Sequence, residues 1–430
     1  VVGSRGAGGK GFVALDVTDV GRVGGGGGPK LLWEFGEEEL QDKNVKMGYS
    51  FPQPTIARLH NGKWAVVTGN GYSAEGSNNG KASLLIIDVA TGALTASLEV
   101  SGENGVANGL STPRLADING DGIADYAYAG DLQGNVWRFD MAPNNGDADN
   151  PFMRKGEPRV SETVQFQVSF GANPLFTAKT ADNKRQPVMA APSIVRHPTG
   201  LGYLIVFGTG KYFAEGDKNG NPDIANTLYG VWDPTTKIAR SANKSGFPYA
   251  GNYSRSNLQQ QTMQSQLHAV TNGGEARLLS NHAVEWAEKR ADGSWRTSKP
   301  GNSSLKAGWY FDLAIDREMI VADMLQFGRT LYLQSLVPNT DPCSSGVDNW
   351  SYAIDPVTGG RTLHHAWTDF RSTSVNTQVI TAVKMDGEGG LSLGQKPDSG
   401  YEVCTGGTCN DVTPDPASIG RQSWRIVEGL

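Results

Sequence analysis

The chain has 430 residues, of which 38% are hydrophobic, and it carries a formal net charge of -6. This length suits one large domain or two to three ordinary ones. Because there is no run of Lys or Arg, nucleic acid and anionic membrane surfaces are excluded as expected partners. No apolar stretch approaches the roughly 18 to 20 residues that cross a bilayer, so no membrane span is expected.

The sequence starts without an initiator methionine or a signal peptide, and its first residues already resemble the approach to a strand. We therefore interpret residues 1–430 as a single domain excised from a longer protein. The stretch GAGGKG matches a dinucleotide fingerprint through Gly6, Gly8 and Gly11. The strand-like FVALDV follows it where a helix would be needed, so we expect no phosphate site there.

One pattern recurs along the chain: a β-branched or aromatic run, then an aspartate, then small polar turn residues. It occurs in GFVALDVTD, ASLLIIDVATGAL, GNVWRFDMA, TLYGVWDPTTK and WSYAIDPVTGG, and its aspartates are Asp16, Asp88, Asp140, Asp233 and Asp355. An aspartate side chain can bond the backbone of a tight turn, and glycine supplies positive φ. These stretches therefore predict strand-turn units.

A second repeat places a proline before an apolar strand at Pro54, Pro113 and Pro192. A glycine follows each of them after 15, 17 and 16 residues, in VVTGNG, AYAGDL and IVFGTG. The 56 glycines and 21 prolines also favour short strands joined by turns. Such regular units predict an all-β fold, a modified β-propeller of four-stranded blades. An irregular β-sandwich is the alternative, and AGWYFDLAI with RTLYLQSLV could add a sixth or seventh unit.

Residues 117–125, DINGDGIAD, place oxygen-bearing side chains at every second position. In an EF-hand-type loop a cation takes side chains from positions 1, 3 and 5, a carbonyl from 7 and often an oxygen from 9, with glycine at 6. Gly122 stands at position 6. The predicted metal ligands are Asp117, Asn119, Asp121, Ile123 (through its carbonyl) and Asp125.

The loop departs from an EF-hand at position 12, where Tyr128 replaces the expected bidentate Glu, and a strand follows in place of a helix. All-oxygen ligation favours Ca²⁺ over zinc or copper, and a flexible loop favours Ca²⁺ over Mg²⁺. We therefore predict one Ca²⁺ site, with a solvated Asx-rich turn as the alternative.

A weaker version of the same alternation occurs in DKNGNPD, where Pro222 replaces the turn glycine, so Asp217, Asn219, Asn221 and Asp223 are expected to form a polar loop. GLSLG at 390–394 matches a nucleophile elbow by its letters, but QKPDSG cannot form the helix that such an elbow requires. The six histidines show no metal-binding spacing. With no acid-base pair either, no catalytic residue, no organic cofactor and no enzymatic activity are predicted.

The main predicted insertion runs from about 234 to 306. It holds NLQQQTMQSQLHAV and EARLLSNHAVEWAEK, whose spaced apolar residues suggest one or two short helices on the rim.

Three cysteines occur in the chain. Cys404 and Cys409 flank a Thr-Gly-Gly-Thr turn and are predicted to form a disulfide, with Cys343 free, which favours an oxidising compartment. Two reduced thiols, or pairing of Cys343 with one of the others, are the alternatives.

Seven stretches together resemble the C-terminal domain of the PilC/PilY family of type IV pilus biogenesis proteins and tip-associated adhesins. They are GAGGKGFVALDVTD, DINGDGIADYAYAGDLQGNVWRFDM, GTGKYF, LYGVWD, LQQQT, DPCSSG and GRQSWRIV. The resemblance covers almost the whole chain.

The resemblance implies a modified seven-bladed propeller with one Ca²⁺ in loop 117–125, and an N-terminal region of the protein that this fragment lacks. It also implies a non-enzymatic role in the periplasm, outer membrane or cell surface, at the pilus tip. There, Ca²⁺ binding and release would tune pilus extension against retraction, and so twitching motility. The implied partners are minor pilins of the tip complex and, in adhesion and virulence, a host-cell receptor.

Two other functions remain open. The Asp-Thr-Gly corners also resemble blades of quinoprotein dehydrogenases, but the sequence has no adjacent cysteine pair to lie beneath a quinone. A purely adhesive, integrin-like propeller with a structural Ca²⁺ is the other alternative.

Overall fold

The structure is a computed structural model that describes seventeen segments of the chain. They are residues 1–18, 28–41, 43, 45–72, 81–103, 105–142, 165–234, 253–264, 266–270, 274–290, 295–296, 304–339, 346–368, 370, 378–385, 390–397 and 400–415. Within them the regular elements are β-strands and short 3-10 turns, so the all-β prediction is confirmed. No helix in these segments is both long enough and apolar enough to span a membrane.

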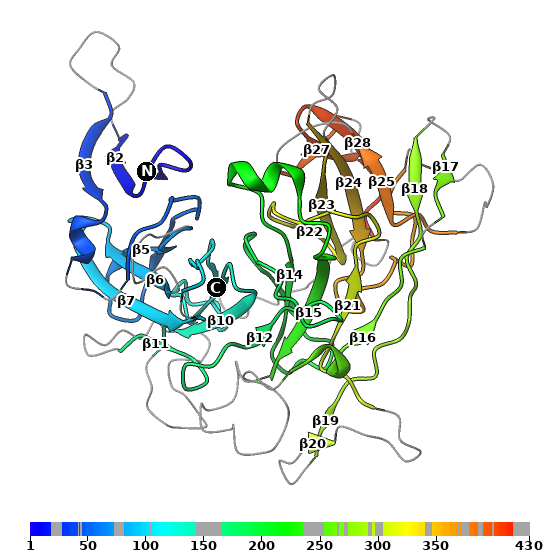
Figure 1. The fold of residues 1–430 in the computed structure, drawn as a ribbon, viewed down its shortest axis with the longest axis horizontal. Coiled ribbons are helices and arrows are strands. Elements are labelled where there is room, and N and C mark those ends of the chain that lie inside the picture. The colour runs from blue at the N-terminus through cyan, green and yellow to red at the C-terminus, as the bar shows by residue number, and fades with distance from the viewer. Residues whose placement is uncertain are drawn as a thin grey trace, which may run out of the picture.

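Five sheets follow one another in chain order, from blue to orange in Figure 1, and we call them blades 1 to 5. Blade 1 contains β1 (Val2–Ser4), β2 (Phe12–Asp16) and β3 (Lys30–Phe35). Blade 2 contains β4 (Thr55–Arg58), β5 (Trp64–Gly69), β6 (Lys81–Asp88) and β7 (Leu94–Ser101). Blade 3 contains β8 (Arg114–Ala116), β9 (Tyr126–Gly130), β10 (Asn135–Asp140), β11 (Gln167–Val168) and β12 (Phe176–Thr177).

The two later blades include short strands from the stretch after β15. Blade 4 contains β13 (Ser193–Arg196), β14 (Tyr203–Gly208), β15 (Thr227–Asp233), β16 (Gln259–Gln260) and β21 (Gly308–Asp312). Blade 5 contains β17 (His268–Ala269), β18 (Glu275–Arg277), β22 (Leu325–Phe327), β23 (Thr330–Pro338), β24 (Val347–Ile354) and β25 (Ala382–Met385). Two further sheets are not hydrogen-bonded into the blades. One is the hairpin of β19 (Glu288–Lys289) and β20 (Trp295–Arg296), and the other is the three-stranded sheet of β26 (Ser392–Gln395), β27 (Tyr401–Thr405) and β28 (Thr408–Val412), which packs on the core of blade 5.

The five aspartate units fall one in each blade, on β2, β6, β10, β15 and β24. The two stretches considered for additional units are not separate blades, because AGWYFDLAI forms β21 of blade 4 and RTLYLQSLV forms β23 of blade 5. The total of seven blades stays a prediction.

The repeated aspartates make two different kinds of interaction. Asp16, Asp88 and Asp355 bond the backbone of the turn that follows, as predicted: the Asp88 carboxylate accepts from the amides of residues 90 and 91. Asp140 and Asp233 instead flank the buried Arg138 guanidinium, at 3.3 and 2.8 Å. The Asp233 carboxylate also accepts from the Tyr128 hydroxyl. The Arg138–Asp233 ion pair therefore joins blades 3 and 4, whereas Asp140 lies on the same strand as Arg138.

The three repeated glycines end β5, β9 and β14, and each faces the segment that leads into the next blade. A Cβ on Gly69 would lie 2.2 Å from the Leu110 carbonyl oxygen, closer than atoms can approach. The same crowding occurs at Gly130 against Val188 and at Gly208 against Ile320. Glycine is therefore required because neighbouring blades pack closely at these points, against backbone at Gly69 and mainly against a side chain at Gly130 and Gly208.

The hydrophobic core lies between neighbouring blades. Successive side chains of a strand point to opposite faces of its sheet. Accordingly Leu85 and Ile87 of β6 pack with blade 1, whereas Leu84 and Ile86 pack with blade 3. The run ASLLIID is apolar on both faces because both faces are covered. A larger cluster continues across blades 3, 4 and 5.

The stretch predicted as an insertion, 234–306, lies between β15 and β21. The helices predicted for the two polar stretches are wrong in the segments that the structure describes: from residue 253 to 306 the helical element described is the 3-10 turn η7 (Arg255–Asn257), and short strands follow it. These strands join existing sheets, since β16 pairs with β21 in blade 4 and β18 pairs with β25 in blade 5. Pairing with a neighbouring sheet edge overrode the weak helical periodicity of this polar stretch.

Candidate metal centre

Loop 117–125 connects β8 to β9, two antiparallel strands of blade 3. The pair Ala116 and Tyr126 closes the hairpin directly beside it. As predicted, strands and not helices flank the loop. Gly120 and Gly122 have φ values of 78° and 82°, and nothing lies within 4 Å of a Cβ built on either of them. The glycine predicted at position 6 of the loop, Gly122, is therefore needed for its backbone conformation.

The Asp117 side chain organises the first half of the loop. One carboxylate oxygen accepts from the amides of Gly120 and Asp121, at 2.7 and 3.2 Å, and the other accepts from Gly122 at 2.8 Å. Three amides thus converge on one exposed carboxylate and hold it at the centre of the turn.

Asn119 and Asp121 lie in the same turn and contact each other. The Asn119 amide nitrogen donates to the Asp121 carboxylate at 3.0 Å, and the Asn119 oxygen accepts from the Asp121 amide at 3.0 Å. The other Asp121 oxygen accepts from the Ile123 amide at 2.8 Å. Within the described segments no donor bonds the Ile123 carbonyl oxygen.

Asp125, the last predicted ligand, is fully buried. One of its carboxylate oxygens lies 2.9 Å from Nε2 of the equally buried His60, and the other accepts from the Ile118 amide at 2.7 Å. Burial raises the pKa of the Asp125 carboxyl above its usual range, and the His60 and Ile118 hydrogen bonds oppose that rise.

The loop also packs against blade 2. Residue Ile123 forms a parallel bridge with Arg58 at the end of β4, and the Ala124 amide donates to the Arg58 carbonyl at 3.0 Å. His60 comes from the same blade 2 segment. The candidate site therefore lies at a boundary between two blades. Sequence reasoning missed His60, because nothing in RLHNGK connects it to an aspartate 65 residues later.

The donor chemistry of the loop fits a hard cation. Three carboxylates, one amide oxygen and the Ile123 carbonyl are all oxygen donors, the ligand type of Ca²⁺. The three carboxylates do not converge on one point: within the described segments, only Glu402, Cys404 and Cys409 bring three His, Cys or acidic ligand atoms within 4.8 Å of one another. In EF-hand-type loops position 9 often acts through a water, which is compatible with an Asp125 already held by His60 and Ile118.

The other sequence motifs do not form sites. Asp217 accepts from the amides of Phe213 and Ala214 beside the turn η4 (Glu215–Asn219), as expected in a polar loop. Gly6 and Gly11 precede strand β2, and Ser392 begins strand β26, so neither the dinucleotide nor the nucleophile motif has its helix.

The predicted disulfide Cys404–Cys409 is present and joins β27 to β28. Since its two sulfurs are bonded to each other, the group with Glu402 is not a metal site. Cys343 lies outside the described segments.

A family model described as the PilY1 beta-propeller domain matches residues 1–273. The type IV pilus biogenesis factor PilY1 of Pseudomonas aeruginosa (strain PAO1) is 45% identical over 446 residues, which cover 100% of this chain and 36% of that protein. A PilY1 homolog of Xylella fastidiosa (strain Temecula1) is 31% identical over 380 residues, 84% of this chain and 22% of the relative.

A crystal structure of the Pseudomonas aeruginosa PilY1 C-terminal domain matches with a TM-score of 0.79 and 43% identity. The match covers 96% of this chain and 81% of that one. The chain spans about a third of the length of the curated relatives in Pseudomonas aeruginosa. The β-propeller prediction is confirmed, and the chain belongs to the PilY1 family of type IV pilus biogenesis factors.

Proposed function

We propose that this chain is a calcium-binding propeller that regulates type IV pilus biogenesis from the pilus tip at the cell surface, without catalysing a reaction. The names of the relatives support the pilus assignment, since they describe biogenesis factors. Its partners in this role would be minor pilins of the tip complex and, for adhesion, a host-cell receptor.

The observation that carries the calcium part is the gathering of oxygen donors in loop 117–125. Asp117, Asn119 and Asp121 lie in one turn, and the buried Asp125 closes the loop. One Ca²⁺ would be held by these four side chains and the Ile123 carbonyl. When bound, the ion supplies positive charge that offsets the repulsion between three carboxylates in nine residues.

Reversible binding is what a regulator requires. Because the loop has Tyr128 where an EF-hand has its bidentate Glu, we expect a dissociation constant on the order of 10⁻⁶ to 10⁻³ M. Within that range, changes in the surroundings would load or empty the site. The proposal is that loading and emptying tune pilus extension against retraction, and with it twitching motility.

Calorimetry with the purified chain tests the site. Asp117→Ala should abolish Ca²⁺ binding, because it removes the carboxylate on which three loop amides converge. The matched control is Asp223→Ala, which removes an exposed carboxylate from the polar loop after η4 and should bind Ca²⁺ like the parent chain. Equal binding by both variants would contradict the assignment of the loop.

Piliation of cells that carry the full-length protein tests the regulation. A variant that does not bind Ca²⁺ in calorimetry should show few surface pili, and deletion of the retraction ATPase should restore them. Normal piliation and motility in that variant would rule out a regulatory role for calcium.

A second candidate is favoured by the packing of the loop on blade 2 through Arg58 and His60. In that view the ion only stabilises a blade boundary of an adhesive propeller. The same cell experiment separates the two candidates, since a structural ion predicts that a variant without Ca²⁺ is less stable but shows normal piliation.

For the quinoprotein alternative, the test is a quinone absorbance in the purified protein.

A further inference from the structure

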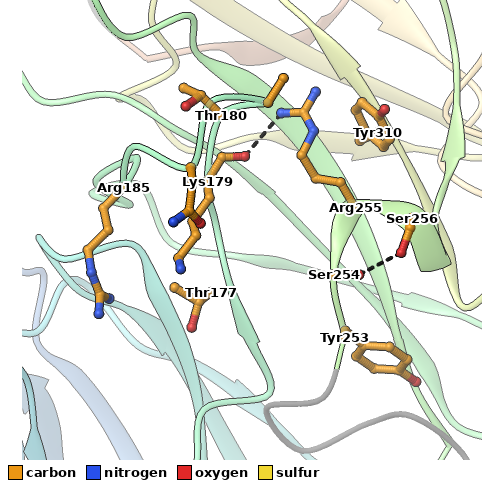
Figure 2. Close-up of a pocket in the computed structure, with 11 residues that line it drawn as sticks. Thr177, Lys179, Thr180, Arg185, Tyr253, Ser254, Arg255, Ser256 and Tyr310 are labelled. Carbon is orange, nitrogen blue, oxygen red and sulfur yellow. Dashed lines mark hydrogen bonds between the residues drawn. The ribbon is translucent and has the colours of Figure 1, made fainter.

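A polar pocket of about 580 Å³ lies between blade 3 and the insertion of blade 4, away from loop 117–125. Thr177 on β12 and the loop after it form one side, with Lys179 and Arg185 (Figure 2). The segment of Tyr253 and Arg255 forms the other side. The volume is in the range of sites that bind small molecules.

The lining chemistry is unusual for such a site. Small-molecule pockets are mostly apolar, whereas here six of the eleven lining residues carry a hydroxyl, three are cationic, one is an amide and none is acidic. The eleven are Thr177, Lys179, Thr180, Ala181, Asn183, Arg185, Tyr253, Ser254, Arg255, Ser256 and Tyr310. A matching ligand would be polar over most of its surface and negatively charged.

One wall is held rigidly. The Arg255 guanidinium makes two hydrogen bonds to the Asp312 carboxylate, at 2.8 and 2.7 Å, and lies over the Tyr310 ring at 4.2 Å from its centroid. It also donates to the Lys179 carbonyl at 3.1 Å, which ties the two walls together. Because Asp312 already neutralises it, Arg255 shapes the pocket more than it attracts an anion.

The opposite wall of the pocket carries two cationic side chains, Lys179 and Arg185, that could attract an anion. Within the described segments, the Lys179 ammonium makes no hydrogen bond or ion pair, although the residue is partly buried. Arg185 is 38% exposed, donates to the Gln133 carbonyl at 3.1 Å and makes a long ion pair with the exposed Glu103 at 3.8 Å. The Asn183 side chain, which can donate and accept, also has no partner in these segments.

We propose that this pocket binds an acidic saccharide. Its carboxylate would lie with Lys179 and Arg185, and its hydroxyls would meet Asn183 and the hydroxyl side chains of the wall. A cationic wall favours an anionic group such as a carboxylate. The scarcity of apolar lining disfavours a peptide that presents hydrophobic side chains. The pocket is separate from loop 117–125, and binding there would not require calcium.

Saturation-transfer NMR on the 430-residue chain tests this inference. Digalacturonate is the probe, and its dimethyl ester, which lacks the carboxylate charges, is the control ligand. Digalacturonate should bind at least about tenfold more tightly than the ester, the effect of one charge-assisted hydrogen bond. Lys179→Met should weaken digalacturonate binding by about the same factor. Ala181→Phe, which fills the pocket from an exposed position, should abolish binding.

The matched control is Lys184→Met, which removes a lysine of the same loop that does not line the pocket and pairs with Asp182 instead. Its affinity should stay within about twofold of the parent chain. EDTA should have no effect. Equal loss in the two lysine variants, equal binding of the ester, no saturable binding of digalacturonate, or tighter binding of an acetylated Asp-Asp peptide would overturn the proposal.

Discussion

His60 and Asp125 are fully buried, and their side chains meet at 2.9 Å across the boundary between blades 2 and 3. A buried carboxylate that loses a hydrogen-bond partner keeps its desolvation cost without the compensating interaction. The pair thus couples the last residue of the candidate calcium loop to the neighbouring blade.

We predict that His60→Ala lowers the free energy of unfolding by about 1–3 kcal/mol, because it leaves one Asp125 oxygen without its partner. Urea denaturation measures this change. His365→Ala is the control, since His365 is exposed, and it should change stability by less than about 0.5 kcal/mol. Equal stabilities would show that solvent replaces His60 at no cost.

A second histidine makes the stability of the fold depend on pH. His197 stacks on Trp232 with ring centroids 4.0 Å apart, and burial lowers its pKa to about 3. In the unfolded chain its pKa would be about 6.5. Because the unfolded state binds the extra proton between these values, stability is full above about pH 6.5 and falls as the pH drops towards 3.

We expect His197 to contribute a loss on the order of 1 kcal/mol per pH unit below about pH 6.5. His197→Phe keeps a ring in the stack and removes the titration, so its stability should vary less between about pH 7 and pH 5. His365→Phe, at an exposed position, should keep the slope of the parent chain. A slope unchanged in His197→Phe would show that other groups cause the pH dependence.

At the scale of elements, the strands are joined across blades by close backbone contacts. We predict that Gly69→Ala destabilises the protein by about 1–3 kcal/mol or more, because its Cβ would lie 2.2 Å from the Leu110 carbonyl oxygen. The control is Gly216→Ala in η4, where nothing lies within 4 Å of the added Cβ. Thermal unfolding of both variants measures the difference, and a smaller loss for Gly69→Ala than for Gly216→Ala would contradict this account.

The hairpin β27–β28 is closed by the disulfide between Cys404 and Cys409, which are directly opposite each other in the register. Since it encloses a short loop, Cys404→Ser with Cys409→Ser should lower the free energy of unfolding by about 2 kcal/mol, at the low end for disulfides. Denaturation with and without reductant measures this. Reductant should not affect the double variant, and a further loss there would point to another disulfide.

At the scale of the whole molecule, each blade is stabilised mainly by its neighbours, so a change in one loop should stay local. We predict that Ca²⁺ slows hydrogen exchange at amides of loop 117–125, which bond to Asp117 and Asp121, and leaves β23 and β24 of blade 5 unchanged. The circular dichroism should also stay nearly the same. Asp117→Ala should remove the effect, and protection that spreads to blade 5 would show a global coupling.

Whether the sequence could predict a feature depends on how far apart in the chain the interacting residues lie. The repeated strand-turn units, the turn of loop 117–125 and the disulfide each depend on residues close together in the chain, so their patterns could be recognised in the sequence. The pairing of His60 with Asp125, the ion pairs of Arg138, and the strands of the insertion depend on partners far along the chain. No local pattern records them: Asp140 and Asp233 have the same motif as Asp88 and yet are buried against Arg138.

The glycine contacts also bear on where the chain could be divided. The end of β5, the second strand of blade 2, packs at Gly69 against Leu110, which lies after the last strand of that blade and before the first strand of blade 3. The Asn70 side chain bonds the Leu110 amide at the same place. A fragment cut at a sheet border would therefore lose part of its own packing. Any portion that is excised, permuted or transplanted would therefore have to carry each blade together with the leader of the next, so consecutive modules overlap in sequence.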